Sequence, residues 1–275
     1  MYIVLMRLIN GEIFMLSLLL KQFKKILTLL LVGFLITTMA IDNYKSYADE
    51  YCSYTVIEQS IETIQKRQCD VIVRVGEYNG KAGKRIYLND IDIHYKDIPI
   101  DIPIHSDLHG AYISEYDINL KTAKAIVKEL NNNGVYAKLQ IANNKYEDLN
   151  AAGRISNKSN PYLYLSRHHN YFDGSGSARG YFAMSKANDY KSQVLANRLS
   201  NSIKYNGLVK QRETQTNSSY IGELNAIHSS TSSVLLELGF FDNATELKNI
   251  CSDNYVNYVS NNLANEISII IREMK

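Results

Sequence analysis

Three observations predict an α/β fold, in which a mostly parallel, twisted sheet is flanked by helices. From residue 98 onward, short apolar stretches alternate with longer stretches in which apolar residues recur every three or four positions. The first pattern is typical of strands and the second of helices that cover a sheet. Two apolar stretches, at 162–165 and 234–236, lack the polar alternation of a half-exposed strand and indicate strands that are buried on both faces.

The composition suits one substantial core and a small appendage. The chain has 275 residues, of which 45% are hydrophobic and 21% charged, and a chain of this length buries a large share of its surface. Its formal net charge is only +2, and its lysines and arginines are scattered. We therefore expect no nucleic acid as a partner, because that would need a basic patch or stripe.

Residues 1–48 are predicted to form a signal peptide or membrane anchor with an upstream extension. Lysines between 21 and 25 precede a nearly uncharged apolar run at 26–41, and Ser46-Tyr-Ala48 offers the small residues of a cleavage site. The run is slightly shorter than the ~20 residues that span a bilayer. Cleavage after Ala48 and membrane anchoring through residues 26–41 are both open, and either one predicts that the rest of the chain is exported.

The three cysteines are Cys52, Cys69 and Cys251. An odd number allows at most one disulfide within the chain, and their spacings match no zinc-binding motif. We expect none of them to be catalytic.

Residues 49–97 are predicted to form a small N-terminal α+β layer. Apolar residues at near-helical spacing indicate an amphipathic helix over 55–68. Alternating patterns indicate short strands over 71–75, 85–88 and 91–93. Glycines at 80 and 83 indicate a turn that joins the first two strands as a hairpin.

The main α/β domain is predicted to span residues 98–275. It begins with an edge strand over 98–104, because Pro99 and Pro103 cannot donate hydrogen bonds within a central ladder. The later strands are expected over 135–141, 162–165, 181–184 and 234–236, and the later helices over 149–157, 194–203 and 256–270. A loop at 173–180, rich in glycine and serine, is expected to be flexible and to form one wall of the ligand site.

The first helix of this domain places a carboxylate close to the end of a strand. Ser114 is a favourable N-cap, and apolar residues at steps of three and four continue to a stop at Asn133-Gly134. Glu115 is therefore expected in the first helical turn, where the helix dipole stabilises a negative charge.

The strand over 162–165 leads directly into Ser166-Arg-His168-His-Asn170. In an open α/β sheet the carboxyl ends of the strands face the ligand crevice, so His168 is a candidate metal ligand. Side chains alternate between the two faces of a strand, and we expect His169 to point away from His168.

Together these residue types suit a hydrolytic zinc centre. His105, His109 and His168 are expected at one rim of the sheet. Glu115 offers a carboxylate ligand, and catalytic zinc commonly has three protein ligands and an open position for water. An ionised carboxylate at Glu237, which follows an apolar strand, is costly unless it is paired, and a raised pKa would suit this residue to proton transfer.

The same residues resemble the zinc-dependent N-acetylmuramoyl-L-alanine amidases of bacterial autolysins and phage endolysins, from about residue 98 to the C-terminus. Three segments resemble the family's Glu-x-Asp-Leu-Asn-Leu, Ser-x-His-x-Asn and Val-Glu-Leu-Gly-Phe motifs, namely Glu115-Tyr-Asp-Ile-Asn-Leu120, Ser166-Arg-His168-His-Asn170 and Val234-Leu-Leu-Glu237-Leu-Gly-Phe240. The three motifs occur in the family's order and spacing. The resemblance implies that Glu115 and His168 bind Zn²⁺ and that Glu237 is the catalytic acid and base.

The chain departs from this family at the first zinc ligand. Relatives usually carry Asp-Pro-Gly-His-Gly-Gly, or Gly-His-Ser, well before the helix glutamate. The candidates here are His105-Ser106 and His109-Gly110, ten and six residues before Glu115, and neither histidine follows a glycine. We favour His105, because the longer connection lets the strand end and the helix start converge, and keep His109 as the alternative.

The resemblance implies an exported peptidoglycan hydrolase, extracellular or bound to the cell wall. It would use a zinc-activated water to cleave the amide bond between N-acetylmuramic acid and L-alanine. Arg154 and Asn170 would contact the substrate or support the ligands. Two alternatives are open: a zinc-dependent peptidoglycan peptidase, and a non-catalytic wall-binding module whose metal site has degenerated.

Overall fold

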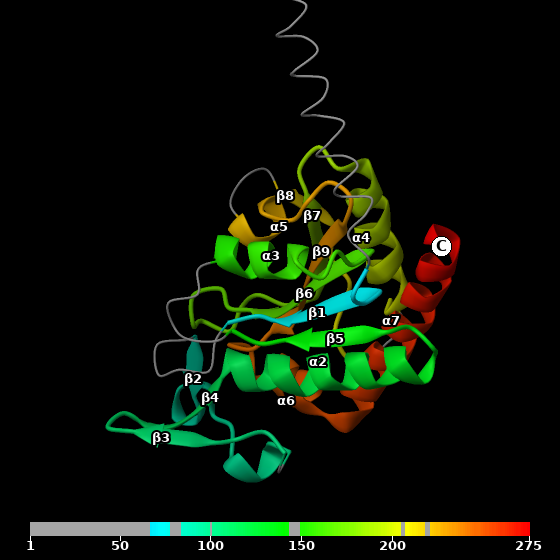
Figure 1. Ribbon diagram of the computed structural model, residues 1–275. Helices are drawn as coiled ribbons and strands as arrows, with labels where there is room; N and C mark the ends of the chain where they lie inside the picture. Colours follow the sequence, from blue (N-terminus) through cyan, green and yellow to red (C-terminus); the bar gives the residue numbers. More distant parts are fainter. Residues whose placement is uncertain (1–66, 78–83, 100, 143–148, 205–206, 218–220) are drawn as a thin grey trace, which may run out of the picture. The chain divides into compact units, whose positions relative to one another are not determined.

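A six-stranded, mostly parallel sheet lies at the centre of the described chain (Figure 1). Its strands, in spatial order, are β5 (Ala137–Gln140), β1 (Val71–Val75), β6 (Leu163–Asn170), β9 (Ser232–Phe240), β7 (Phe182–Lys186) and β8 (Gln215–Asn217). β1 is parallel to β5 and β6, and β6 is parallel to β9. β7 is antiparallel to β9 and parallel to β8. The predicted α/β class with a mostly parallel sheet is confirmed.

The structure is a computed structural model that describes residues 67–77, 84–99, 101–142, 149–204, 207–217 and 221–275. These residues belong to a unit that starts at residue 66. The predicted signal peptide or anchor, Cys52 and most of the predicted helix over 55–68 lie outside the described residues. In the part of the chain that is described, no helix is both long enough and apolar enough to span a bilayer.

Helices cover both faces of the sheet. They are α2 (Glu115–Asn132), α3 (Leu149–Asn157), α4 (Tyr190–Ser202), α5 (Gly222–Asn225), α6 (Ala244–Cys251) and α7 (Asp253–Met274). In Figure 1, α2 and α6 lie below the sheet, and α3 and α5 lie above it. The larger apolar core joins the sheet to α2, α4 and α7, and a smaller apolar cluster joins the opposite face to α5.

The two longest helices follow their sequence signals closely. The Ser114 side chain accepts a hydrogen bond from the Asp117 N–H, which caps α2, and the chain leaves α2 through Gly134 at a φ of +77°. A left-handed residue of this kind is a common helix stop. In α7 the predicted apolar face is buried, at Val256, Val259, Leu263, Ile267 and Ile270, and the helix packs mainly against α2.

The predicted N-terminal layer and its boundary at residue 97 are wrong. β1 does not form a hairpin with residues 85–88 but is an inner strand of the main sheet, between β5 and β6. All five of its residues are buried, including Arg74, and a strand covered on both faces belongs to a large core rather than to a thin surface layer. Residues 91–93, also predicted as a strand, lie at the end of a 3₁₀ turn that closes with Asp92 in the left-handed region.

A separate three-stranded antiparallel sheet lies beside the start of α2. It consists of β2 (Arg85–Tyr87), β4 (Gly110–Ser114) and β3 (His105–Asp107), with the 3₁₀ turns η1 (Leu88–Ile91) and η2 (Tyr95–Asp97) between β2 and β3. The edge strand predicted over 98–104 is absent from the described residues of that range. Ile98 and Ile102, four positions apart, are both buried, and the Ile102 N–H donates to the Pro99 carbonyl. The prolines therefore shape a turn rather than an edge strand.

Candidate metal centre

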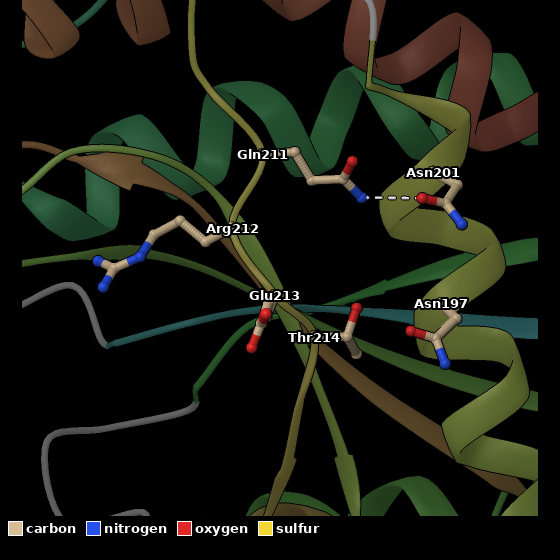
Figure 2. A pocket seen from close by; sticks show the side chains of 6 residues that line it. All are labelled: Asn197, Asn201, Gln211, Arg212, Glu213 and Thr214. Atoms are coloured by element: carbon tan, nitrogen blue, oxygen red, sulfur yellow. Dashed lines mark hydrogen bonds between the residues drawn. The ribbon is translucent and has the colours of Figure 1, made fainter.

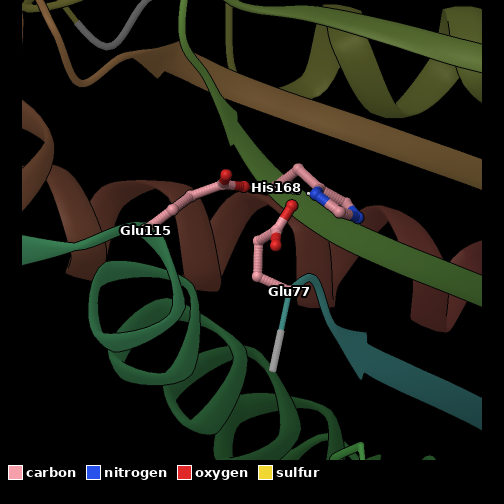
Figure 3. A group of neighbouring side chains, drawn as sticks. All are labelled: Glu77, Glu115 and His168. Atoms are coloured by element: carbon pink, nitrogen blue, oxygen red, sulfur yellow. Dashed lines mark hydrogen bonds and ion pairs between the residues drawn. The ribbon is translucent and has the colours of Figure 1, made fainter. Parts of the chain in front are cut away.

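Three side chains converge at the carboxyl edge of the sheet. Glu77 follows β1, Glu115 begins α2 and His168 lies near the end of β6. Each offers one ligand atom, and the three ligand atoms lie within 4.8 Å of one another. Figure 3 shows the two carboxylates and the imidazole directed toward a common point.

The sheet topology explains why segments so distant in sequence meet here. β1 and β6 are parallel neighbours, with Val75 opposite Arg167, so their carboxyl ends lie side by side. The chain then passes very close to the His168 ring at Gly76, where an added Cβ would lie 2.5 Å from the ring atom Nδ1. Glycine is needed at this position because any side chain would displace the ring.

Glu115 is held by donors from two elements. Its Oε1 accepts hydrogen bonds from the Asn119 side chain at 3.0 Å and from the His169 backbone N–H at 3.2 Å, and it lies 3.2 Å from Nδ1 of His168. The residue is only 1% exposed. The predicted position of Glu115 in the first turn of α2 is thus confirmed, and its carboxylate is fixed toward the end of β6.

His168 lies between two carboxylates. Its Nδ1 faces Glu115, and its Nε2 lies 3.4 Å from Oε1 of Glu223, a residue of α5. Burial disfavours the charged ring, but the contacts with Glu115 and Glu223 outweigh this effect and hold the pKa of His168 well above its usual value. A cation placed on Nδ1 would take over the role of the proton that this environment favours.

Glu237 lies next to His168 in the sheet. The two residues are direct partners in the parallel β6–β9 pair, so their side chains lie on the same face. Burial raises the pKa of Glu237 to about 7, with His168 opposing the rise and Glu115 adding to it. Its Oε2 is buried and has no hydrogen-bond partner in the described part of the chain, as expected of a carboxylate that acts on something bound beside it.

The donor set fits a divalent cation. Two carboxylate oxygens and one imidazole nitrogen are all accepted ligands of zinc. The pKa of Glu77 is raised, first by burial and then by the nearby charge of Glu115, so the charge of Glu115 opposes the ionisation of Glu77. A positive ion between them would remove that repulsion.

The first ligand predicted from the sequence needs correction. His105 lies in β3 with its Nε2 2.7 Å from Oδ2 of Asp117, and its ring stacks on Tyr112. His109 is exposed and meets the ring of Tyr87 edge-on. Among the described residues, neither histidine belongs to the group of converging donors.

Glu77 takes the place in that group for which a histidine was expected. The signal was present in the sequence as Val75-Gly76-Glu77, a buried strand followed by glycine and a possible ligand, which is the arrangement of the family's Gly-His motif with glutamate instead of histidine. It was missed because residues 71–75 were assigned to a separate layer. Glu223 was missed as well, because it lies in a short helix with no recognised motif.

Two other candidates are not part of this group. Arg154 is exposed on α3. Asn170 ends β6, and its side-chain oxygen accepts a hydrogen bond from the Tyr171 N–H at 2.7 Å. This bond stabilises the turn that leaves the strand. The proposed roles of Arg154 and Asn170 at the substrate therefore stay predictions.

The loop that follows β6 is tied down by the segment after β9. The Asp242 carboxylate accepts from the N–H groups of Phe172 and Gly174, at 3.3 and 3.1 Å, and Glu246 accepts from the Gly180 N–H at 2.7 Å. The Gly- and Ser-rich loop predicted to be flexible is therefore anchored at both of its ends.

A cavity of about 510 Å³ lies beside α4 and β8. Its wall consists of Asn197, Asn201, Gln211, Arg212, Glu213 and Thr214. Figure 2 shows the Gln211 amide donating to Asn201, while the Arg212 side chain points away from α4. The Arg212 guanidinium lies over the rings of Phe182 and Phe240, at 5.8 and 5.4 Å. None of the converging donors lines this cavity.

The two described cysteines are buried with free thiols. Burial raises the pKa of Cys69, and it raises that of Cys251 to about 12. Both thiols therefore stay protonated at neutral pH, and neither has the character of a nucleophile.

A sequence profile described as N-acetylmuramoyl-L-alanine amidase matches residues 106–268. The match spans 163 of the 275 residues (268 − 106 + 1) and contains Glu115, His168 and Glu237. Glu77 precedes the matched segment. A search of curated protein sequences finds no match.

Several solved structures share the fold. An N-acetylmuramoyl-L-alanine amidase from Clostridium difficile 630 has a TM-score of 0.58 and 17% identity, over 74% of this chain and 97% of that one. AmiC2 of Nostoc punctiforme gives a TM-score of 0.55 and 21% identity over 74% and 96%. The catalytic domain of CwlV from Bacillus (Paenibacillus) polymyxa gives 0.56 and 16% over 74% and 97%. At these identities the comparison establishes the fold.

Proposed function

The chain belongs to the N-acetylmuramoyl-L-alanine amidase family, and we propose that Glu77, Glu115 and His168 hold a zinc ion beside Glu237 for cleavage of the amide bond between N-acetylmuramic acid and L-alanine of peptidoglycan. The observation that carries this proposal is the placement of Glu237 next to His168 on one face of the sheet. A proton-transfer group and a group of metal donors thus share one edge of the sheet.

The chemistry divides between the ion and the protein. When bound, zinc supplies Lewis acidity toward a carbonyl oxygen and toward water. Glu237 in its ionised form accepts the proton of the attacking water and then donates it to the amide nitrogen of the leaving L-alanine. A pKa of about 7 suits both steps, because a group that must accept and then donate a proton works best when its pKa is near the operating pH.

A digest of purified peptidoglycan tests metal, reaction and bond together. We expect the full chain to release intact stem peptides and to leave a free lactyl carboxylate on muramic acid, as measured by mass analysis of the products. A chelator should abolish this activity and added zinc should restore it. Cut stem peptides would identify a peptidase instead, and an absence of any cleavage with metal bound would favour the non-catalytic wall-binding alternative.

The variant Glu237→Gln separates catalysis from metal binding. Glutamine has the same shape but cannot accept the water proton, so turnover should fall by a factor on the order of 10²–10⁴. Zinc content after dialysis should equal that of the wild type. Near-normal turnover in this variant would remove Glu237 from the proposed mechanism.

We also propose that the protein acts outside the cytoplasm, on the cell wall. The support is the basic, apolar and small-residue pattern of residues 21–48, together with a substrate that lies outside the cytoplasmic membrane. N-terminal sequencing of the mature protein from its host tests whether the segment is removed after Ala48 or retained as an anchor.

A further inference from the structure

We propose that Glu223 is a positioning residue, which holds the Nε2 side of His168 so that Nδ1 is presented to the metal. The inference rests on the proposed metal centre and adds to it a fourth carboxylate that binds no metal itself. Glu223 lies in α5, outside the three family motifs, and it does not belong to the group of converging donors.

Three residues of one face of β6 reach this carboxylate. Tyr164, Ser166 and His168 alternate along the strand, so their side chains point to the same side. The Ser166 hydroxyl donates to Oε1 of Glu223 at 2.6 Å, and the Tyr164 hydroxyl donates to Oε2 at 3.0 Å. Nε2 of His168 lies 3.4 Å from Oε1, at ion-pair distance, and makes no hydrogen bond in the described part of the chain. Both carboxylate oxygens are therefore engaged, in a residue that is 1% exposed.

The backbone of Glu223 is fixed by close helix packing. α3 approaches α5 so closely at Gly153 that an added Cβ would lie 2.6 Å from the Glu223 carbonyl oxygen. On the other side of the residue, an added Cβ at Gly222 would lie 2.7 Å from the Asn150 side chain. Because α3 packs against both positions, the backbone that carries the Glu223 carboxylate is fixed, as are the hydrogen-bond donors to that carboxylate.

This arrangement decides which hydrogen the ring keeps when a metal is bound. Glu115 and Glu223 are both acceptors, so each favours hydrogen on the ring nitrogen that it faces, Nδ1 at 3.2 Å and Nε2 at 3.4 Å. A cation held beside Glu115 would replace the hydrogen on Nδ1, and the remaining hydrogen would lie on Nε2, toward Glu223. Nδ1 also faces the passing chain at Gly76. Metal-bound histidines commonly donate their second N–H to such a partner, and loss of that partner typically lowers metal affinity about 10–100-fold.

The test compares Glu223→Gln with Glu246→Gln in the full chain. Glu246 is a matched control, because it is also a buried glutamate that accepts two hydrogen bonds, from the N–H groups of Phe240 and Gly180, but it makes no contact with His168. The probe is Zn²⁺ alone, titrated in competition with a chromophoric chelator. The second readout is the ¹⁵N spectrum of the histidine rings in the zinc-loaded proteins.

We expect Glu223→Gln to lower zinc affinity about 10–100-fold and to shift or lose the Nε2–H signal of His168. Glu246→Gln should keep the zinc affinity within about threefold of the wild type and should leave the Nε2–H signal of His168 unchanged. Glu223→Asp retains the charge but shortens the side chain, so it should give an intermediate loss of zinc affinity. It replaces Glu223→Gln as the test variant if Glu223→Gln does not fold. Equal affinity losses in the two Gln variants, or an unchanged His168 ring spectrum in Glu223→Gln, would overturn the proposal. A wild type that binds no zinc would instead refute the metal centre itself.

Discussion

The two faces of the end of β6 carry adjacent histidines in opposite electrostatic settings. His168 faces the carboxylates of Glu115 and Glu223. His169, buried on the other face, contacts the Arg167 guanidinium at 2.9 Å and the side-chain oxygen of Asn119 at 3.1 Å. Burial, then Arg167, then His168 hold the pKa of His169 well below its usual value. The surroundings of His168 therefore favour a bound cation, whereas His169 stays neutral beside the cationic Arg167.

Position in the strand, rather than residue type, therefore distinguishes the candidate metal ligand His168 from the structural residue His169. On the His169 face, Asn119 accepts from Arg167 and donates to Glu115 and to the Gly76 carbonyl. Most polar groups of this face therefore bond to one another, although Nε of Arg167 has no partner in the described chain. On the His168 face, an oxygen of Glu237 stays without a partner in the described chain. The first arrangement is typical of a structural network and the second of a site that receives something.

The largest loss of zinc affinity is expected from His168→Ala. Loss of a ligand should reduce zinc affinity by more than the roughly 10–100-fold that follows from losing a supporting contact. Amidase turnover should fall accordingly, and the unfolding free energy without metal should fall as well, because loss of the imidazole leaves the buried carboxylates of Glu115 and Glu223 without their shared partner. Zinc titration and chemical denaturation measure the two effects. Retention of zinc by this variant would contradict the assignment.

His169→Ala should lower stability while it spares zinc binding. It removes an acceptor from the buried Arg167, and an unsatisfied buried charge costs on the order of 3 kcal/mol. Zinc affinity should stay within about tenfold of the wild type, since losses of about 10–100-fold are expected only when a side chain that contacts a metal ligand is removed. If this variant instead lost zinc without loss of stability, the two faces would not be separable as described.

Glu237→Gln should increase stability in the absence of metal at alkaline pH. The pKa of Glu237 is raised from 4.5 to about 7 in the folded protein, so folding favours the protonated form. The fold therefore loses stability as pH rises from about 4.5 through 7, by on the order of 3 kcal/mol, since each pKa unit corresponds to about 1.4 kcal/mol. Glutamine does not titrate.

Denaturation in chelator measures this prediction at two pH values. The variant should be more stable than the wild type at pH 8 and about equal to it at pH 4. A difference that is the same at both pH values would show that packing, rather than ionisation, causes it.

Gly76→Ala should weaken the His168 face selectively. The added Cβ would lie 2.5 Å from the imidazole and 2.6 Å from the Arg167 carbonyl, so either the ring or the strand end must move. We expect a loss of stability of about 1–3 kcal/mol and about a tenfold loss of zinc affinity. Gly134→Ala is the control, because nothing lies within 4 Å of its added Cβ, and it should leave zinc affinity unchanged.

The smallest effect is expected from Glu77→His, which would restore the family's usual ligand. An imidazole suits zinc better than a carboxylate does, whereas carboxylates suit Mn²⁺ and Mg²⁺. Zinc affinity should rise about tenfold, which is about 1.4 kcal/mol, and the preference for zinc over Mn²⁺ should widen. Competition titrations with both ions test this, and an unchanged preference would mean that Glu77 is not a ligand.

Much of the fold was predictable from the sequence because its elements carry strong local signals. The N-cap at Ser114, the stop at Gly134 and the apolar face of α7 each have one physical interpretation. Residues 71–75 were correctly predicted as a strand but assigned to the wrong sheet, because the sequence of a short strand does not indicate which strands it pairs with. The pairing of β1 with β5 and β6 joins residues that lie more than sixty positions apart, and local patterns contain no information on it.

The site was predictable where a motif carried it and not elsewhere. Glu115 and His168 converge as expected, whereas His105 was chosen for its residue type and for the loop length before Glu115. The family's motif predicts histidine at the first ligand position, so the glutamate after Gly76 was not recognised as a candidate ligand. Glu223 had no sequence signal, because its role depends on α5 packing against α3.

The donors Glu77, Glu115 and His168 are separated by 38 and 53 residues along the chain (115 − 77 and 168 − 115). An ion held by all three would act as a reversible cross-link that closes two long loops, one of which includes the entire β2-β4-β3 sheet. Cross-links of this kind restrict the unfolded chain most when the loops are long. The loaded protein should therefore resist proteases far longer than the chelated one.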